Sequence, residues 1–234
     1  MAAGDIVFIH SEFADLPAAL KQTIFDPLLL EKAGLIIKVL RGRGKTYFFK
    51  LREDGCVLRH YWRGGSIRRL SADKYIWLGL NQTRSYREWK MLELLETLKL
   101  PAPRRVGLRI RRTGLCYTSD IVTKEIKGSL SLADALKVED LSADTWKLVG
   151  RTIRSFHDHN IFHQDLNASN ILLTKRYCFL IDFDRGRVMN GDWWKERTLR
   201  RLKRSLEKFG SKEIHFHFNE GHWMTLLDGY EEMD

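Results

Sequence analysis

Long apolar segments and paired cysteines are both missing from this chain of 234 residues. No apolar run reaches the roughly 18 residues of a membrane-spanning helix. No basic stretch, apolar core and small-residue cleavage site open the sequence, so we expect no secretory signal. Cys56, Cys116 and Cys178 stand singly, without a C-x-x-C pair. We therefore expect reduced core thiols in a cytosolic protein, not a disulfide framework.

Acidic residues are fewer than basic ones. The chain has 30 Asp and Glu against 40 Lys and Arg, which gives a net charge of +10. Such an excess predicts a polyanionic partner: nucleic acid, an anionic membrane, or a phosphorylated or carboxylated substrate. Charge alone does not choose among them.

The first half of the chain is rich in predicted strands. Residues 35–62 have the pattern of a three-stranded meander, with a Gly-rich turn at 41–44 and Asp54-Gly55 at the second turn. Residues 84–99 have the apolar spacing of a helix that ends before Pro101. Two more strands are predicted at 104–111 and 115–123.

The second half is mainly helical. Ser142 is a plausible N-cap for a helix with an apolar face, and residues 170–173 and 178–181 predict a small hairpin. A basic helix is expected from Asp192 to Phe209. We therefore predict an α+β, bilobal fold with a β-rich lobe at 1–123 and a shortened, mainly helical lobe at 124–234. A cleft between lobes is a usual place for a ligand.

The strongest chemical signal is the segment His163-Gln-Asp-Leu-Asn-Ala-Ser-Asn170. It matches H-x-D followed by Asn five residues after the Asp, the catalytic-loop pattern of kinases. Phosphoryl transfer needs a carboxylate to orient the attacking hydroxyl and accept its proton, and Asp165 is predicted to be that catalytic base. Asn170 supplies an oxygen ligand for Mg²⁺.

A second carboxylate, Asp182, follows the next apolar run, where kinases hold the Asp that binds the metal bridging the phosphates of ATP. The alternative is that Asp165 and Asn170 only shape a turn, as both residue types often do. The order helix, motif, strand, turn, strand and Asp182 favours the kinase interpretation.

Glycines in the first turn of the meander invite two interpretations. Gly44-Lys45-Thr46 resembles the end of a P-loop, but Val39 stands where that motif needs its first Gly, and a strand follows in place of a helix. We reject a P-loop. Gly42 and Gly44 fit a phosphate-covering hairpin instead, although Gly in a hairpin is often only a turn residue.

A phosphate-binding cation is expected on the third strand, paired with a Glu from a helix. No Lys lies in that strand, so Arg59 and His60 are the possible cations, and Arg59 is preferred because it is always charged. An exposed basic residue without this role is the plainer alternative. Glu88, next to the apolar face of the predicted helix, is the expected partner.

Five segments together resemble the 3-deoxy-D-manno-octulosonic acid (Kdo) kinases of the lipopolysaccharide kinase group of Gram-negative bacteria. Besides the catalytic loop, they are Val57-Leu-Arg-His-Tyr-Trp-Arg-Gly-Gly65, Thr83-Arg-Ser-Tyr-Arg-Glu-Trp-Lys90, Leu100-Pro-Ala-Pro103 and Leu180-Ile-Asp-Phe-Asp-Arg-Gly186. The resemblance runs from about Gly34 to Gly186.

This resemblance implies a protein-kinase-like fold that uses ATP and Mg²⁺. It implies phosphorylation of a Kdo hydroxyl, the 4-OH in that family, on a lipid A precursor. The place would be the cytoplasmic face of the inner membrane, with the protein bound peripherally. Two residues depart from the protein-kinase pattern: Gln164 replaces an Arg, and Asp184 replaces the Gly of D-F-G, leaving open whether Asp184 also binds metal.

A sugar acceptor fits better than a protein. The segment between Asp182 and the basic helix is short, and no A-P-E motif follows. Basic residues that could attract an anionic glycolipid and membrane surface are Arg63, Arg68, Arg69, Arg197, Arg200, Arg201, Lys203 and Arg204. Trp193, Trp194 and Trp223 belong either to that surface or to the core, and the basic residues could simply form a solvated face.

Other classes of function remain as alternatives. A kinase for the lipopolysaccharide core heptose, or for another small molecule, would share the same motifs. A kinase-like binding protein without activity conflicts with the intact Asp165, Asn170 and Asp182. No nucleic-acid recognition motif is visible, so we predict no nucleic-acid partner and no protein partner.

Overall fold

The computed structural model describes residues 4–41, 44–62 and 73–232 of the chain. Two compact units can be distinguished by their internal contacts. Unit 1 comprises residues 1–93 and 103–125, and unit 2 comprises residues 94–102 and 126–234.

Unit 1 is built on an antiparallel sheet in the order β1-β6-β7-β4-β3-β2, with β5 paired to β7. The strands are β1 (Asp5–Ile9), β2 (Ile36–Arg41), β3 (Lys45–Leu51), β4 (Asp54–His60), β5 (Tyr75–Ile76), β6 (Arg105–Thr113) and β7 (Cys116–Lys124). The meander β2-β3-β4 and the hairpin β6-β7 confirm the strands predicted from the sequence. The second turn was wrongly placed at Asp54-Gly55: these residues pair with Leu51 and Lys50 in the ladder, so the turn lies at residues 52–53.

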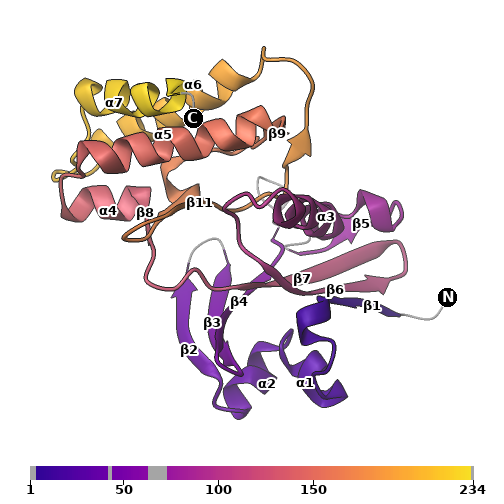
Figure 1. Cartoon of the computed structure of the whole chain (residues 1–234). Coiled ribbons are helices and arrows are strands. Elements are labelled where there is room, and N and C mark those ends of the chain that lie inside the picture. The colour runs from indigo at the N-terminus through magenta and orange to yellow at the C-terminus, as the bar shows by residue number, and fades with distance from the viewer. Residues whose placement is uncertain (1–3, 42–43, 63–72, 233–234) are drawn as a thin grey trace. The chain divides into compact units, whose positions relative to one another are not determined.

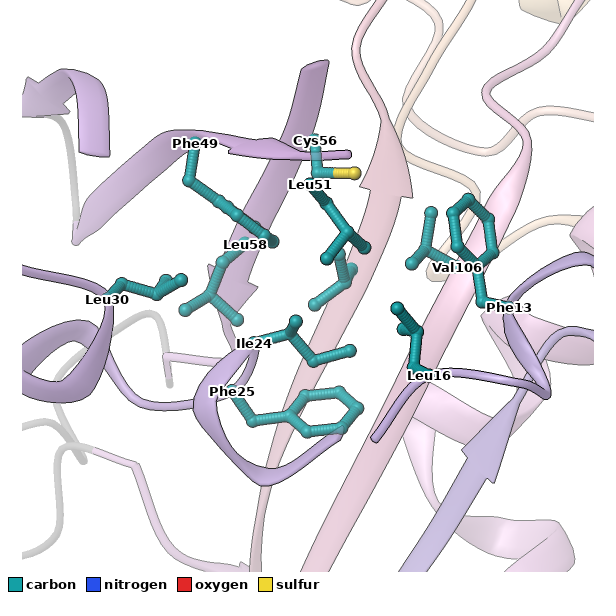
Figure 2. Packing of buried hydrophobic residues seen from close by; sticks show 11 residues of the cluster. Phe13, Leu16, Ile24, Phe25, Leu30, Phe49, Leu51, Cys56, Leu58 and Val106 are labelled. Atoms are coloured by element: carbon teal, nitrogen blue, oxygen red, sulfur yellow. The ribbon is translucent and has the colours of Figure 1, made fainter. Parts of the chain in front are cut away.

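Among the described residues, three α-helices belong wholly or mostly to unit 1: α1 (Ala18–Thr23), α2 (Pro27–Lys32) and α3 (Arg84–Thr97), the last being the predicted helix. Figure 2 shows how the segment around α1 and α2 packs on the sheet, with Ile24, Phe25 and Leu30 facing Phe49 and Leu58. All five side chains are buried. Burying an apolar side chain of this size contributes about 1.5–3 kcal/mol, so this core anchors the sheet that carries Arg59.

The described part of unit 2 contains four further α-helices: α4 (Leu132–Val138), α5 (Ala143–Asp158), α6 (Lys195–Gly210) and α7 (Glu220–Glu231). Its short strands are β8 (Leu130–Ser131), β9 (Ile161–Phe162), β10 (Ile171–Leu173), β11 (Cys178–Leu180) and β12 (Arg187–Val188). They form a sheet in the order β11-β10-β8 and a separate pair β12-β9.

The predicted start and buried face of α5 are both confirmed. The Ser142 side chain accepts a hydrogen bond from the backbone N–H of Thr145, which satisfies one donor at the helix N-terminus. Trp146 and Phe156, at opposite ends of the apolar face, are buried. The hairpin β10-β11 and the basic helix α6 also lie where the sequence predicted them.

Helices α5 and α7 run side by side with glycine at the contact (Figure 1). A methyl group at Gly150 would collide with backbone atoms of Leu226 and Tyr230, and one at Gly229 with the backbone of Lys147. Both positions therefore need a residue without a side chain, because the backbones approach too closely for a Cβ atom. Across the described part of the chain, no helix is long and apolar enough to cross a membrane.

Candidate active site

The predicted catalytic loop lies in unit 2, between β9 and β10. Its first residue, His163, is buried, and the distance from its Nε2 to the carbonyl oxygen of Ile181 is 2.8 Å. Nε2 is therefore the protonated nitrogen, since a carbonyl oxygen only accepts. This bond ties the loop to the residue before Asp182. Burial lowers the pKa of His163, so its ring is neutral at physiological pH.

Side-chain amides hold the backbone of Asp165 in place. Its carbonyl oxygen accepts hydrogen bonds from Nδ2 of Asn167 at 2.8 Å and from Nδ2 of Asn170 at 2.9 Å. Oδ1 of Asn167 in turn accepts from the backbone N–H of Ser169, which caps the short 3-10 turn Ala168–Asn170. These hydrogen bonds pre-organise the loop. They fix the backbone of Asp165, whose carboxylate is half-exposed.

Asn170 and Asp182 lie at the same end of the β10-β11 hairpin. The strands pair Ile171 with Leu180, and the N–H of Ile181 donates to the carbonyl oxygen of Asn170 at 3.0 Å. Asp182 follows directly, so Asn170 and Asp182 are neighbours at this end of the hairpin. The Asn170 nitrogen is engaged by Asp165, so Oδ1 is its atom suited to a metal.

These oxygen donors suit Mg²⁺, which binds through one or two carboxylates, substrate phosphates and water. Within the described ranges, no group of three or more His, Cys, Asp or Glu could form an all-protein cage. The residues present fit a metal shared with a nucleotide. Asp182 also has a φ of 69°, in the left-handed region that Asp tolerates at a cost.

Aromatic packing fixes the segment after Asp182. The Phe183 ring lies edge-on to His163, with centroids 4.7 Å apart, and stacks on Phe156 of α5 at 5.6 Å. The N–H of Gly186 donates to the carbonyl of Phe183 and closes a tight turn around Asp184. Buried Phe183 therefore connects the catalytic loop to the core of unit 2.

In unit 1, Arg59 and Glu88 form the predicted ion pair. Glu88 is buried on α3, and its second carboxylate oxygen accepts from the hydroxyl of Tyr61. A buried carboxylate requires partners of this kind. The pairing is confirmed, and the role of Arg59 in binding phosphate stays a prediction. Tyr61 was not predicted, although it stands in the Arg-His-Tyr segment singled out in the sequence.

His60 occupies a different environment from Arg59. Successive residues of a strand face opposite sides of the sheet. Nδ1 of His60 lies 2.7 Å from Oδ1 of Asp120, and Nε2 lies 3.3 Å from Oδ2 of Asp73. Asp120 also pairs with Arg109 at 3.0 Å. Both ring nitrogens of His60 therefore face carboxylates, whereas Arg59 pairs with Glu88 of α3. Of the two possible cations on β4, Arg59 is the one that meets the predicted helix.

The Gly-rich turn is described only in part. Gly42 lies outside the described residues, as do Arg63, Arg68 and Arg69. Gly44 precedes β3, and the indole of Trp62 lies against it so closely that a Cβ atom at Gly44 would collide with the ring. A larger residue at position 44 would therefore displace Trp62.

The basic helix α6 contacts the catalytic loop, which the sequence did not predict. Arg201 forms an ion pair with Asp165, and the N–H of Ala168 donates to Oγ of Ser205 at 3.2 Å. Of the three tryptophans considered for a membrane surface, Trp194 and Trp223 are buried and Trp193 is exposed. The core interpretation is thus right for two of the three.

Comparison with known proteins agrees with these features. Residues 29–230 match the model of the lipopolysaccharide kinase (Kdo/WaaP) family. A 3-deoxy-D-manno-octulosonic acid kinase of Haemophilus influenzae (strain PittEE) is 38% identical over 218 residues, covering 89% of this chain and 90% of that protein. The protein of the same name from Photobacterium profundum is 37% identical over 211 residues, covering 90% and 89%.

The fold has a solved counterpart in WaaP, determined in complex with acyl carrier protein. Its TM-score is 0.60 at 17% identity, covering 96% of this chain and 88% of that one. This likeness shows the kinase-like α+β fold predicted from the sequence. With the family model spanning both units, and with relatives matched over most of their length, the chain is a phosphotransferase of the lipopolysaccharide kinase (Kdo/WaaP) family.

Proposed function

We propose that this enzyme transfers the γ-phosphoryl group of ATP to the 4-OH of Kdo on a lipid A precursor, in lipopolysaccharide inner-core synthesis. The observation that carries the proposal is the loop His163–Asn170, fixed by hydrogen bonds beside Asp182. The names of relatives at 37–38% identity support Kdo as the sugar. The choice of the 4-OH rests on the resemblance to the Kdo kinase family.

Asp165 acts as the base in the proposed reaction. The acceptor oxygen forms a bond to the γ-phosphorus while the bond from phosphorus to the bridging oxygen of ADP breaks, and Asp165 takes the hydroxyl proton. Asn170 and Asp182 would hold Mg²⁺, which when bound offsets the negative charge of the phosphates. The kinase pattern assigns Arg59 to the α- and β-phosphates, and Gly42 and Gly44 to the phosphate-covering turn.

A mass measurement tests the proposed acceptor. The purified chain, ATP, Mg²⁺ and a Kdo-bearing lipid A precursor should give a product heavier by one phosphate, and fragmentation should place it on the 4-OH of Kdo. A heptose-bearing acceptor is incubated in parallel. Phosphate on the heptose and none on Kdo would replace the proposed substrate by the core heptose and leave the kinase chemistry intact.

The proposed location is the cytoplasmic face of the inner membrane, bound peripherally. Support comes from an apolar tip of unit 1, formed by Ile76, Leu78 and Leu115, whose side chains are exposed by 63%, 74% and 78%. Ile76 is paired with Cys116 in the strand next to Leu115, so these side chains share one edge of the sheet. Lys74 and Arg112 flank the tip, and basic residues beside apolar ones favour an anionic lipid surface.

Vesicle binding tests this location. Wild type should sediment with vesicles containing phosphatidylglycerol and remain in solution with phosphatidylcholine alone. Leu78→Ser combined with Leu115→Ser should weaken binding, whereas Val138→Ser, at an exposed site in unit 2, should not. Equal binding of all three proteins would show that the tip does not hold the membrane.

A further inference from the structure

One oxygen of the Asp165 carboxylate is bound by a guanidinium. Arg201 of α6 donates to Oδ1 of Asp165, and the two side chains are exposed by 47% and 41%. The acceptor hydroxyl must approach this same carboxylate to give up its proton. The contact between Arg201 and Asp165 therefore occupies an atom that the reaction needs.

Helix α6 is fixed on the catalytic loop at this point. Ser205, one turn after Arg201 and on the same side of the helix, accepts a hydrogen bond from the N–H of Ala168. Between Asp165 and Asn170 the loop contains no charged residue. The cation beside the base is thus supplied by a separate helix, 36 positions along the chain.

Arg201 belongs to a basic stripe on α6. The stripe consists of Arg197, Arg201, Arg204 and Lys208, whose spacing of four, three and four residues places them on one face, and all four are exposed. It extends about 16 Å along the helix. Among the described residues, Arg197, Arg204 and Lys208 have no acidic partner, in contrast to Arg200 and Lys203, which pair with Glu196 and Glu220.

We propose that Arg201 is a gate that makes the reaction depend on an anionic acceptor, an inference that rests on the proposed function. Without acceptor, Arg201 masks Asp165. An oxyanion of the acceptor draws the guanidinium away, and the hydroxyl then reaches the uncovered carboxylate. The rest of the stripe binds further anionic groups of the same molecule.

The chemistry of the pair favours such an exchange. An ion pair between half-exposed side chains is weak in water and contributes little to stability. Arg binds carboxylate and phosphate through two parallel hydrogen bonds, so an incoming oxyanion competes well for it. Masking also lowers futile ATP hydrolysis, because a water molecule carries no charge with which to displace Arg201.

The test compares wild type, Arg201→Gln, Arg201→Lys and Arg151→Gln. Arg151 is a matched control, since it forms an exposed pair with Glu232 elsewhere in unit 2. Each protein is assayed for ATP hydrolysis without acceptor and for phosphorylation of three acceptors. These are the Kdo-bearing precursor, its Kdo methyl ester, and the precursor without its lipid A phosphates.

Wild type should prefer the unmodified acceptor over one of its analogues by about tenfold or more in kcat/KM. The disfavoured analogue identifies the oxyanion as the sugar carboxylate or a lipid phosphate. In Arg201→Gln this preference should fall toward one, and hydrolysis without acceptor should rise several-fold. Arg201→Lys should be intermediate, and Arg151→Gln should retain the wild-type preference.

Two results overturn the gate: an unchanged preference in Arg201→Gln, or hydrolysis no faster than in wild type. If wild type phosphorylates none of the three acceptors, the proposed substrate is wrong. The hydrolysis comparison then still decides whether Arg201 masks Asp165, so the two failures are distinguishable.

Discussion

Arg59 and Glu88 form an ion pair between β4 and α3, 29 positions apart in the chain, with the carboxylate buried and the guanidinium partly exposed. Removal of the cation leaves a buried negative charge beside the hydroxyl of Tyr61. We predict that Arg59→Met lowers the free energy of unfolding by about 2–4 kcal/mol in urea titrations.

The double variant Arg59→Met with Glu88→Gln should regain part of that loss, because the second change removes the stranded charge. Both proteins should show a raised KM for ATP if Arg59 binds phosphate. If the double variant recovers stability and both variants keep the wild-type KM for ATP, the ion pair has a structural role only.

A substitution of Asp182 can distinguish the strain of its backbone from its proposed role in metal binding. Asn has the same shape as Asp and also tolerates the left-handed conformation that Asp182 adopts at φ 69°. Asp182→Asn should therefore retain the stability of the wild type while the Mg²⁺ concentration for half-maximal activity rises at least about tenfold, the loss usual for a weakened metal site. Activity is measured across a Mg²⁺ titration. Wild-type Mg²⁺ dependence in this variant would exclude Asp182 as a ligand.

Acid should destabilise unit 2 through His157. Burial lowers the pKa of His157 to about 3, and its Nδ1 lies 2.8 Å from the hydroxyl of Tyr230. The unfolded chain binds this proton near pH 6.5 and the folded chain does not. The contribution of His157 is therefore complete above pH 6.5 and is lost as the pH falls toward 3. At pH 5 the loss is about 2 kcal/mol.

Urea unfolding at pH 7 and pH 5 measures this effect. His157→Gln, which has no titrating ring, should lose less stability between the two pH values than wild type does. Some dependence should persist, because the pKa of buried His163 is lowered in the same direction. Identical pH dependence in the two proteins would contradict the assignment to His157.

The close approach of α5 and α7 predicts a steric effect. Gly229→Ala places a methyl group against the backbone of Lys147, so the helices must move apart. We expect a loss of about 1–3 kcal/mol in the free energy of unfolding, the range for overpacked cores. Gly210→Ala is the control, because a Cβ there meets its nearest neighbour, in Phe216, at 3.6 Å, an ordinary contact. Equal stability of both variants would mean that the helices adjust at no cost.

Local patterns were enough to predict the meander, α5 and the catalytic loop. Each depends on residues close together in the chain, such as the Ser142 cap or the spacing of Asp165 and Asn170. The partnership of Arg59 with Glu88 was also predictable, because β4 has few cations and α3 has one Glu beside its apolar face. The first helices were missed: α1 and α2 are only six residues each. Asp26 before Pro27 was the available signal for α2, since the Asp side chain caps the helix.

Contacts between distant segments could not be predicted. The pairing of Arg201 with Asp165 depends on how α6 is rotated against the loop, which no local pattern specifies. The hydrogen bond from His163 to Ile181 requires the hairpin register, and the burial of Trp194 beside His157 requires tertiary packing. Sequence motifs thus identified the reactive groups, whereas their supporting contacts emerged only in three dimensions.

Asp165→Asn tests the central claim most directly, since Asn keeps the shape of the side chain and cannot accept the hydroxyl proton. Transfer of labelled γ-phosphate from ATP to the Kdo-bearing precursor is measured in both proteins, together with nucleotide binding. We predict a fall in kcat of about 10²–10⁴-fold with nucleotide affinity retained. Transfer at the wild-type rate in Asp165→Asn would contradict the account.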